Sequence, residues 1–216
     1  MAVNLRAPHD VLEVLGIELG TAATGFKVTD DVVVARLHPN ARVAGVYTQS
    51  AFAAAPVLLA RDREGHCQAW VINSGNANAA TGEPGKQDAE AICAKVAECL
   101  HIDAESVLPF STGVIGERLD VPALNRAAAV AVERLNSAGW LSAASAIMTT
   151  DTVPKLISRR VALATGEVVV TGMAKGSGMI KPDMATMLAF VACDATISAP
   201  LLSALTTDLA GRSFNR

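Results

Sequence analysis

The sequence predicts an α/β fold in which helices cover layered sheets of mixed or largely antiparallel strands. Three observations support this class. Short apolar runs rich in β-branched residues are separated by turns containing Gly, Pro or Asp, which is typical of strands and hairpins. Three or four other segments carry apolar residues at helical spacing and interrupt the strands irregularly. With 51% hydrophobic and 18% charged residues, the 216-residue chain can bury a substantial core.

The first part of the chain is expected to contribute mainly strands. Residues 15–25 are punctuated by glycine and show no clear periodicity. The strands that follow are predicted at 26–29, 31–37, 43–48 and 68–72. Residues 45–57 are interpreted as the end of a strand followed by a turn of small residues. In the strand at 68–72, Trp70 and Ile72 share one face and Val71 takes the other, because side chains alternate along a strand.

Helices are predicted where apolar residues recur every three or four positions. The clearest is 86–100, which carries a continuous stripe made of Ala89, Ile92, Cys93, Val96, Ala97 and Leu100. A second runs from Val121 to about Asn136, with Asp120 as its cap. A third covers 140–148, and the last begins near Ser198.

The central feature is the connection at 175–190, between strands predicted at 167–174 and 187–194. The first of these strands forms a hairpin with 158–164. Within the connection, the hydroxyl of Thr186 can attack the carbonyl of Ala185 and turn the peptide into an ester that water splits. The product would be an N-terminal threonine, whose hydroxyl and amine form a nucleophile and its base. The residue types alone favour an ordinary strand, turn and strand.

Other polar stretches lie where predicted strands or helices end. The loop 73–82 (NSGNANAATG) offers asparagines and glycines that tolerate left-handed backbone and provide donors near a ligand. In 107–117 (VLPFSTGVIGE), the Thr112 hydroxyl and the Gly113 amide could both donate to one oxyanion. Lys175 is either a solvated lysine at a strand end or a ligand for a substrate carboxylate. On residue types alone, structural roles are favoured for the two loops.

Residues 176–190 (GSGMIKPDMATMLAF) resemble the self-cleavage segment of the glutamate N-acetyltransferases, also called ornithine acetyltransferases, of arginine biosynthesis. Residues 45–57, 73–82 and 107–117 resemble other segments of the same family. The resemblance implies a layered α/β architecture similar in its logic to N-terminal-nucleophile enzymes. It implies a precursor that cuts itself between Ala185 and Thr186.

The resemblance also implies a reaction and a set of site residues. Acetyl would pass from Nα-acetylornithine to the enzyme and then to the amine of glutamate. The implied residues are Thr186 as nucleophile and substrate ligand, Thr112 and Gly113 as the oxyanion hole, and Thr152 and Lys175 as substrate ligands. Thr150 is the less favoured alternative to Thr152.

Residues 1–185 would correspond to the family's α-chain and 186–216 to the start of its β-chain. The family's β-chain is much longer, so the sequence resembles a truncated precursor or fragment that we expect to be inactive alone. Asp183, where many relatives carry asparagine, is a smaller departure from the family pattern. The expected partners are acetylornithine, glutamate, the chain's own β-chain and further copies in an α2β2-type assembly. Two alternatives stay open: a related self-processing aminopeptidase or amidase, and an inert fragment.

Composition and motifs argue against other classes of function. A net charge of −3 provides no basic surface for nucleic acid, and no apolar run approaches the ~18 residues of a membrane span. The four cysteines lack metal-ligand spacing and are expected to be free thiols in the cytoplasm. No dinucleotide or phosphate-loop motif is present, so we expect no cofactor, with acetyl-CoA left open as a co-substrate.

Overall fold

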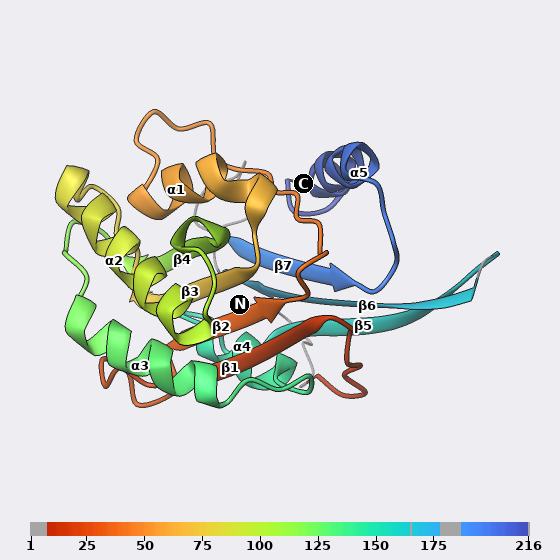
Figure 1. Cartoon of the computed structure of the whole chain (residues 1–216), viewed down its shortest axis with the longest axis horizontal. Helices are drawn as coiled ribbons and strands as arrows, with labels where there is room; N and C mark the ends of the chain where they lie inside the picture. The colour runs from red at the N-terminus through yellow and green to blue at the C-terminus, as the bar shows by residue number, and fades with distance from the viewer. Residues whose placement is uncertain (1–7, 165, 178–186, 216) are drawn as a thin grey trace.

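The structure is a computed structural model that describes residues 8–164, 166–177 and 187–215. Its strands are β1 (Ile17–Ala22), β2 (Val32–Leu37), β3 (Ala69–Asn76), β4 (Val107–Val114), β5 (Lys155–Leu163), β6 (Gly166–Lys175) and β7 (Leu188–Cys193). Its α-helices are α1 (Ala55–Arg63), α2 (Gly82–Leu100), α3 (Val121–Glu133), α4 (Trp140–Ala146) and α5 (Ala199–Arg212). Two short 3₁₀ turns, Glu64–His66 and Ala104–Ser106, precede β3 and β4. The α/β class with mixed and antiparallel sheets is therefore confirmed (Figure 1).

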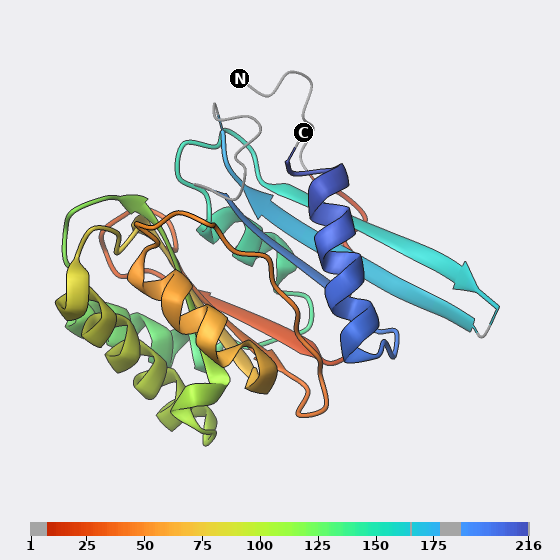
Figure 2. The same cartoon turned by 90° about the horizontal axis from the view of Figure 1, so that it is seen from above.

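The strands form two separate sheets. The first has the order β1-β2-β3-β4, in which β1, β2 and β3 pair antiparallel and β3 pairs parallel with β4. The second has the order β5-β6-β7 and is antiparallel throughout. Figures 1 and 2 show α2 and α3 covering one side of the four-stranded sheet, while β5–β7 lie on its other side.

Alternating side chains divide the core into two layers, one on each face of the four-stranded sheet. Trp70 and Ile72 of β3 join the layer between the two sheets, whereas Val71 faces the helices, as the alternation predicts. The layer between the sheets also contains Leu19, Leu108, Trp140, Met173 and Phe190. The helical layer contains the predicted stripe of α2, in which Ala89, Ile92, Cys93, Val96 and Ala97 are all buried.

An aromatic cluster made of Trp70, Phe110 and Phe190 connects the two sheets. The Phe190 ring lies 5.2 Å from Trp70 and 5.0 Å from Phe110 between centroids, the latter edge-to-face. Rings at these separations gain a specific attraction beyond the burial of their surface. Because Phe190 is on β7 and its partners are on β3 and β4, this contact fixes the second sheet against the first.

Several elements differ from the prediction. Residues 26–29 are not a strand, because the Asp31 carboxylate accepts hydrogen bonds from the Thr24 amide at 2.7 Å and hydroxyl at 2.6 Å and closes a loop. Residues 43–48 are also not a strand. Strand β1 was missed because Gly20 interrupts its apolar pattern. That glycine is required, since a Cβ there would lie 2.0 Å from the Ala131 carbonyl oxygen of α3.

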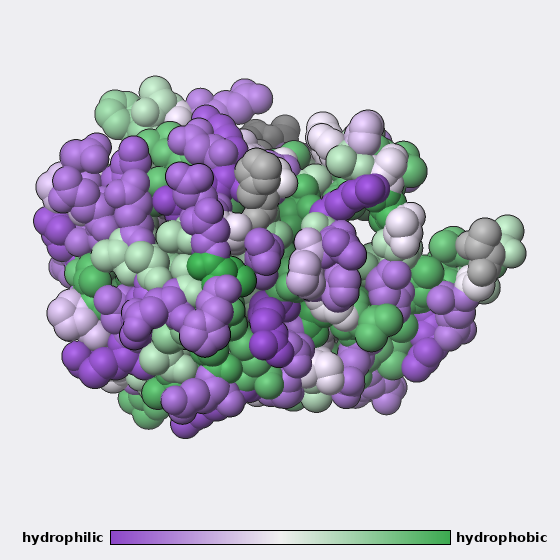
Figure 3. All heavy atoms as spheres, viewed as in Figure 1, coloured by the Kyte–Doolittle hydropathy of each residue, from purple (hydrophilic) through white to green (hydrophobic). Residues whose placement is uncertain are grey.

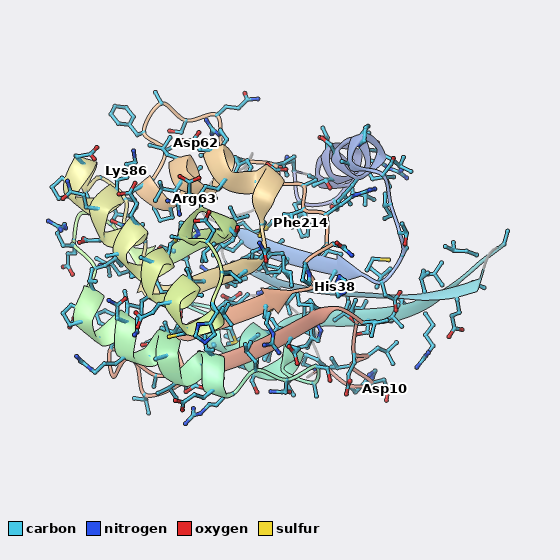
Figure 4. All side chains as sticks on the ribbon, viewed as in Figure 1. Asp10, His38, Asp62, Arg63, Lys86 and Phe214 are labelled. Carbon is cyan, nitrogen blue, oxygen red and sulfur yellow. The ribbon has the colours of Figure 1, made fainter. Side chains whose placement is uncertain are left out.

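Helix α1 was likewise missed, because its apolar residues are not confined to one face. Pro56, in its first turn, helps to start it, since that position needs no amide donor. Figure 4 shows Asp62 on the outer side of this helix, next to Arg63. The guanidinium of Arg63 donates to the carbonyls of Ala104 and Val107, each at 3.3 Å, and ties the helix to the start of β4.

Hydrophilic side chains cover most of the visible surface of α2 and α3, whereas hydrophobic residues reach the surface beside β5–β7 and α5 (Figure 3). The exposed apolar side chains of this region include Ile157, Val191, Leu201, Leu205 and Leu209. The predicted apolar side of the last helix is therefore uncovered in this chain. All four cysteines are free, and two of them, Cys67 and Cys93, are buried. None of the described helices is long and apolar enough to cross a membrane.

Replacing Phe190 by Ala should lower the free energy of unfolding by about 3–5 kcal/mol, the usual cost of removing a buried Phe. The adjacent Val191→Ala provides the control, because Val191 is 59% exposed on the opposite face of the same strand. We expect the control to change stability by less than about 0.5 kcal/mol. Urea unfolding followed by fluorescence measures both. Equal effects of the two substitutions would show that the aromatic cluster does not hold the sheets together.

Candidate active site

The ends of β3 and β4 bring the asparagine-rich loop beside Thr112 and Gly113. The two strands are parallel, so their carboxyl ends meet at one edge, with Ser74 opposite Thr112 and Gly75 opposite Gly113. Gly113 has a φ of 136°. A Cβ at this position would lie 2.2 Å from the Gly75 carbonyl carbon, so only glycine allows this approach.

The asparagines of this loop mainly hold the loop itself. The Asn73 side-chain amide donates to the Asn76 carbonyl at 2.8 Å, and the Asn78 amide donates to the Gly85 carbonyl at 2.7 Å. Asn78 is fully buried with a φ of 46°, which is the left-handed conformation anticipated for this stretch. The loop is thus a rigid wall beside Thr112, and one N–H of each of these two amides is used to hold the loop.

Lys175, the last residue of β6, is buried and contacts two threonines. Its ammonium donates to Thr112 Oγ1 at 2.9 Å and to Thr149 Oγ1 at 2.7 Å. Only 5% of the residue is exposed, so the interpretation as a solvated lysine at a strand end is wrong. Burial lowers the pKa of Lys175, the nearby Asp151 carboxylate opposes this, and the charges of Lys155 and Lys27 lower the pKa further.

Asp151 organises the loop that precedes β5. Its carboxylate forms an ion pair with Lys155 and accepts hydrogen bonds from the Gly176 amide at 3.0 Å and the Thr149 amide at 3.4 Å. Burial raises the pKa of Asp151, but the hydrogen bonds from Lys155 and from these two amides outweigh it and lower the pKa overall. This carboxylate therefore fixes the backbone just after Lys175.

Lys27 reaches the same region from the loop between β1 and β2. Its ammonium donates to Ser74 Oγ at 2.7 Å, to the Ala146 carbonyl at 3.2 Å and to the Met148 carbonyl at 2.9 Å. The Ser74 hydroxyl also donates to the Ala146 carbonyl, at 2.6 Å. Burial lowers the pKa of Lys27, and the charge of Asp31 opposes that shift. The charged groups of this region are thus three lysines and two aspartates: Lys27, Lys155, Lys175, Asp31 and Asp151.

The structure brings together three of the predicted site residues, Thr112, Gly113 and Lys175. Thr152 is exposed, one residue after the buried carboxylate of Asp151. Ala185 and Thr186 lie outside the described residues. The described ends of the connection that carries them are adjacent, since a Cβ on Gly176 would lie 3.6 Å from Met187 Cγ.

The sequence did not single out Lys27, Thr149, Asp151 or Lys155. The stretch 148–154 was recognised as a run of hydroxyls with one carboxylate, but nothing in it showed that Thr149 would reach Lys175. Nothing in the sequence pointed to Lys27 as a site residue, because it lay in a segment that was wrongly predicted to be a strand.

Other hollows and clusters do not compete with this region. A surface hollow of about 330 Å³ lies between β1 and α3, and another of about 240 Å³ lies beside Pro8–Asp10 and the start of β5. Neither is lined by Thr112, Thr149 or Lys175. Within the described ranges, no group of His, Cys, Asp and Glu side chains could hold a metal ion.

Comparison with known proteins identifies the family of this chain. The model of the ArgJ family matches residues 18–216. The chain is 47% identical to the "Arginine biosynthesis bifunctional protein ArgJ" of Pseudomonas fluorescens, over 100% of this chain and 54% of that protein. It is 50% identical to the protein of the same name from Methylococcus capsulatus, over 94% of this chain and 50% of that protein. The chain thus spans about half the length of the curated relatives it matches.

Two solved structures have folds similar to that of this chain. The arginine biosynthesis bifunctional protein argJ of Bacillus halodurans is 34% identical, with a TM-score of 0.70 over 81% of this chain and 92% of that one. The ornithine acetyltransferase of Mycobacterium tuberculosis, solved in complex with ornithine, is 35% identical. Its TM-score is 0.71 over 77% of this chain and 91% of that one.

Replacing Lys27 by Met should raise the pKa of Lys175, because it removes one of the two positive charges that lower it. NMR titration of lysines labelled with carbon-13 at Cε measures this pKa. The control is Lys95→Met, which removes a lysine paired with Glu98 on α2 and should leave the pKa of Lys175 unchanged. A pKa of Lys175 that stays constant or falls in Lys27→Met would contradict the proximity of these charges.

Proposed function

Because this chain belongs to the ArgJ family, we propose that it is part of a self-cleaving acetyltransferase of arginine biosynthesis. The acetyl group moves from Nα-acetylornithine to the hydroxyl of Thr186, ornithine leaves, and the amine of glutamate then takes the acetyl group. One nucleophile thus serves both half-reactions, with an ester of Thr186 as the intermediate. The observation that carries the proposal is the buried contact between Lys175 and Thr112, beside Gly113 and at the start of the connection that contains Thr186.

Thr186 is proposed to become a nucleophile through cleavage of the bond that precedes it. Its hydroxyl adds to the Ala185 carbonyl carbon, the carbon–nitrogen bond breaks, and the nitrogen takes a proton and becomes an amine. Water then hydrolyses the resulting ester. The freed α-amine titrates near ~7.7–8.0, so it can serve as the base for the hydroxyl at neutral pH.

Thr112 and Gly113 are proposed to stabilise the oxyanion that forms on the attacked carbonyl. Thr112 and Gly113 are consecutive residues at the end of β4, and the close approach of Gly75 restricts the backbone there. Donors that are already oriented need no reorganisation when charge develops, which makes such pairs effective in catalysis.

Lys175, and with it Thr152, is proposed to bind the carboxylate end of the amino-acid substrate. A buried ammonium attracts a carboxylate more strongly than an exposed one, because less water screens the charges. The same charge lowers the pKa of a nearby amine and would keep the Thr186 amine neutral.

We also propose that the two pieces stay together after cleavage and assemble further in an α2β2 manner. Six residue pairs join β6 to β7 across the connection, from Val170 with Cys193 to Lys175 with Leu188. Phe190 comes after the proposed cleavage site in the sequence. It packs in a core whose other buried residues come before that site. Cleavage between residues 185 and 186 would therefore leave β6 in one piece and β7 in the other, with both strands in the same sheet.

Replacing Thr186 by Ala should abolish both self-cleavage and acetyl transfer in the protein at the full length of its relatives, because the hydroxyl is the nucleophile in each. Ser at this position should retain part of both activities. Intact mass detects the cleavage, and acetylglutamate formation from acetylornithine detects the transfer. If the alanine variant still splits at this bond, the cleavage mechanism is wrong.

Replacing Thr112 by Ala should lower kcat about 10²–10³-fold, the range for losing one oxyanion donor. The matched control, Thr112→Ser, keeps the hydroxyl and should retain most of the activity. Unfolding temperatures of the two variants show whether the fold is intact. An alanine variant that folds and keeps its kcat would assign Thr112 a structural role.

A further inference from the structure

Lys27 uses all of its hydrogen-bond donors inside the chain. Its ammonium has three N–H groups and no acceptor, and it donates to Ser74 Oγ at 2.7 Å, to the Met148 carbonyl at 2.9 Å and to the Ala146 carbonyl at 3.2 Å. Because the ammonium cannot accept, Ser74 Oγ accepts from it and donates its own proton to the Ala146 carbonyl at 2.6 Å. Three donors and three acceptors leave no N–H of Lys27 for a substrate, so this side chain is suited to hold other groups in place.

The loop that carries Lys27 is fixed to the end of β3. The Ser74 amide donates to the Asp31 carbonyl, where this loop ends, at 2.9 Å. The ring of Phe26, the residue before Lys27, lies against Gly75, since a Cβ on this glycine would be 2.6 Å from Phe26 Cδ1. Lys27 therefore starts from a defined position beside the end of β3, the strand that pairs with β4.

The carbonyls that Lys27 holds lie where α4 ends. Ala146 is the last residue of this helix, and the last carbonyls of a helix need partners and carry partial negative charge, so an ammonium suits this position. The chain then runs through residues 147–154 into β5. In this loop the buried carboxylate of Asp151 accepts from the Gly176 amide at 3.0 Å, directly after β6. The end of α4 is thus linked to the backbone where the proposed cleavage connection begins.

Lys27 consequently joins the two sides of the site. The proposed oxyanion donors, Thr112 and Gly113, are on β4 in the first sheet, where Thr112 is opposite Ser74 in register. The proposed cleavage connection leaves β6 in the second sheet. A residue that ties the end of β3 to the loop that fixes Gly176 therefore constrains how far apart these two sides lie.

We propose that Lys27 is a positioning residue, whose ammonium clamps the end of α4 onto Ser74 and so holds the two sides of the site at their working distance. Lys27 acts through the backbone that it holds and contacts no reacting atom. The catalytic part of this inference rests on the proposed function, because the distance affects a rate only if acyl transfer takes place there. Misplacing reacting groups by about 1 Å can lower a rate ~10²-fold, so a clamp remote from the reaction can still control its rate.

The clamp itself is tested in the 216-residue chain, without any reaction. Lys27→Met keeps most of the side-chain stem and removes the three donors. We expect hydrogen exchange of the Ile147 and Met148 amides, measured by NMR, to become about tenfold faster, because hydrogen bonds to a charged group no longer hold the end of α4. Lys95→Met, which removes a lysine paired with Glu98 on α2, is the control and should leave these rates unchanged. Equal exchange in Lys27→Met and the parent chain would overturn the proposal.

Ser74→Ala provides a second test that keeps the charge of Lys27. It removes only the hydroxyl that joins Lys27 to Ala146, so exchange of the same two amides should become about threefold faster. If Lys27→Met does not fold, unchanged exchange in Ser74→Ala overturns the proposal instead.

The consequence for catalysis is tested in the protein at the full length of its relatives, at a temperature where each variant is folded. Intact mass gives the cleaved fraction, and kcat is expressed per cleaved molecule. Lys27→Met should lower kcat about 10–10²-fold and change KM by less than about threefold, because the reacting groups are misplaced and not lost. Lys27→Arg, which keeps a positive charge and N–H donors, should recover part of the loss. Lys95→Met should keep the wild-type kcat.

The possible results separate this proposal from the proposed function. A Lys27→Met variant with normal kcat but a lower unfolding temperature would make Lys27 merely structural and overturn the proposal. A wild-type protein that transfers no acetyl group would overturn the proposed function, and the catalytic part of this inference with it. The hydrogen-exchange measurement would still decide whether Lys27 holds the end of α4.

Discussion

The buried ammonium of Lys175 is the interaction on which the arrangement of the site depends. Moving a charged amine out of water costs several kcal/mol unless other groups replace the lost hydration. Here the replacements come from different elements: Thr112 from the four-stranded sheet, Thr149 from the loop after α4, and Asp151 nearby. The ammonium is therefore stable only when the two sheets and this loop are in place together. This requirement couples the packing of the layers to the geometry of the site.

Much of the fold could be predicted, because strong periodicity reports burial directly. Helices α2 and α3 and the strands β2, β3, β5, β6 and β7 follow from their apolar patterns, with ends displaced by a few residues. The failures lie where packing overrides pattern. Gly20 breaks the pattern of β1 and yet is needed for the approach of α3, and α1 has no single apolar face. Residues 26–29 have the residue types of a strand but are held in a loop by Asp31.

The site was predictable only in part, and for a different reason. A family resemblance supplied the roles of four residues: Thr112, Gly113, Thr152 and Lys175. The match to the ArgJ family confirms that the chain belongs to this family. The structure adds that the first two and Lys175 are neighbours. It could not be foreseen that Thr149 reaches Lys175, because neighbouring threonines have the same chemistry and only the course of the loop selects one. Lys27 illustrates the same limit, since its three acceptors come from two distant segments.

The place of the connection between β6 and β7 suggests how the chain would keep its site if the proposed cleavage occurs. The connection joins the ends of two neighbouring antiparallel strands, whose pairing needs no covalent link once the sheet has formed. Asp151 holds the Gly176 amide on the first side, and Phe190 anchors the second side in the aromatic cluster. Both anchors lie outside the segment that the proposed reaction alters. A nucleophile released by cleavage would thus remain attached to a strand whose place is already set by the core.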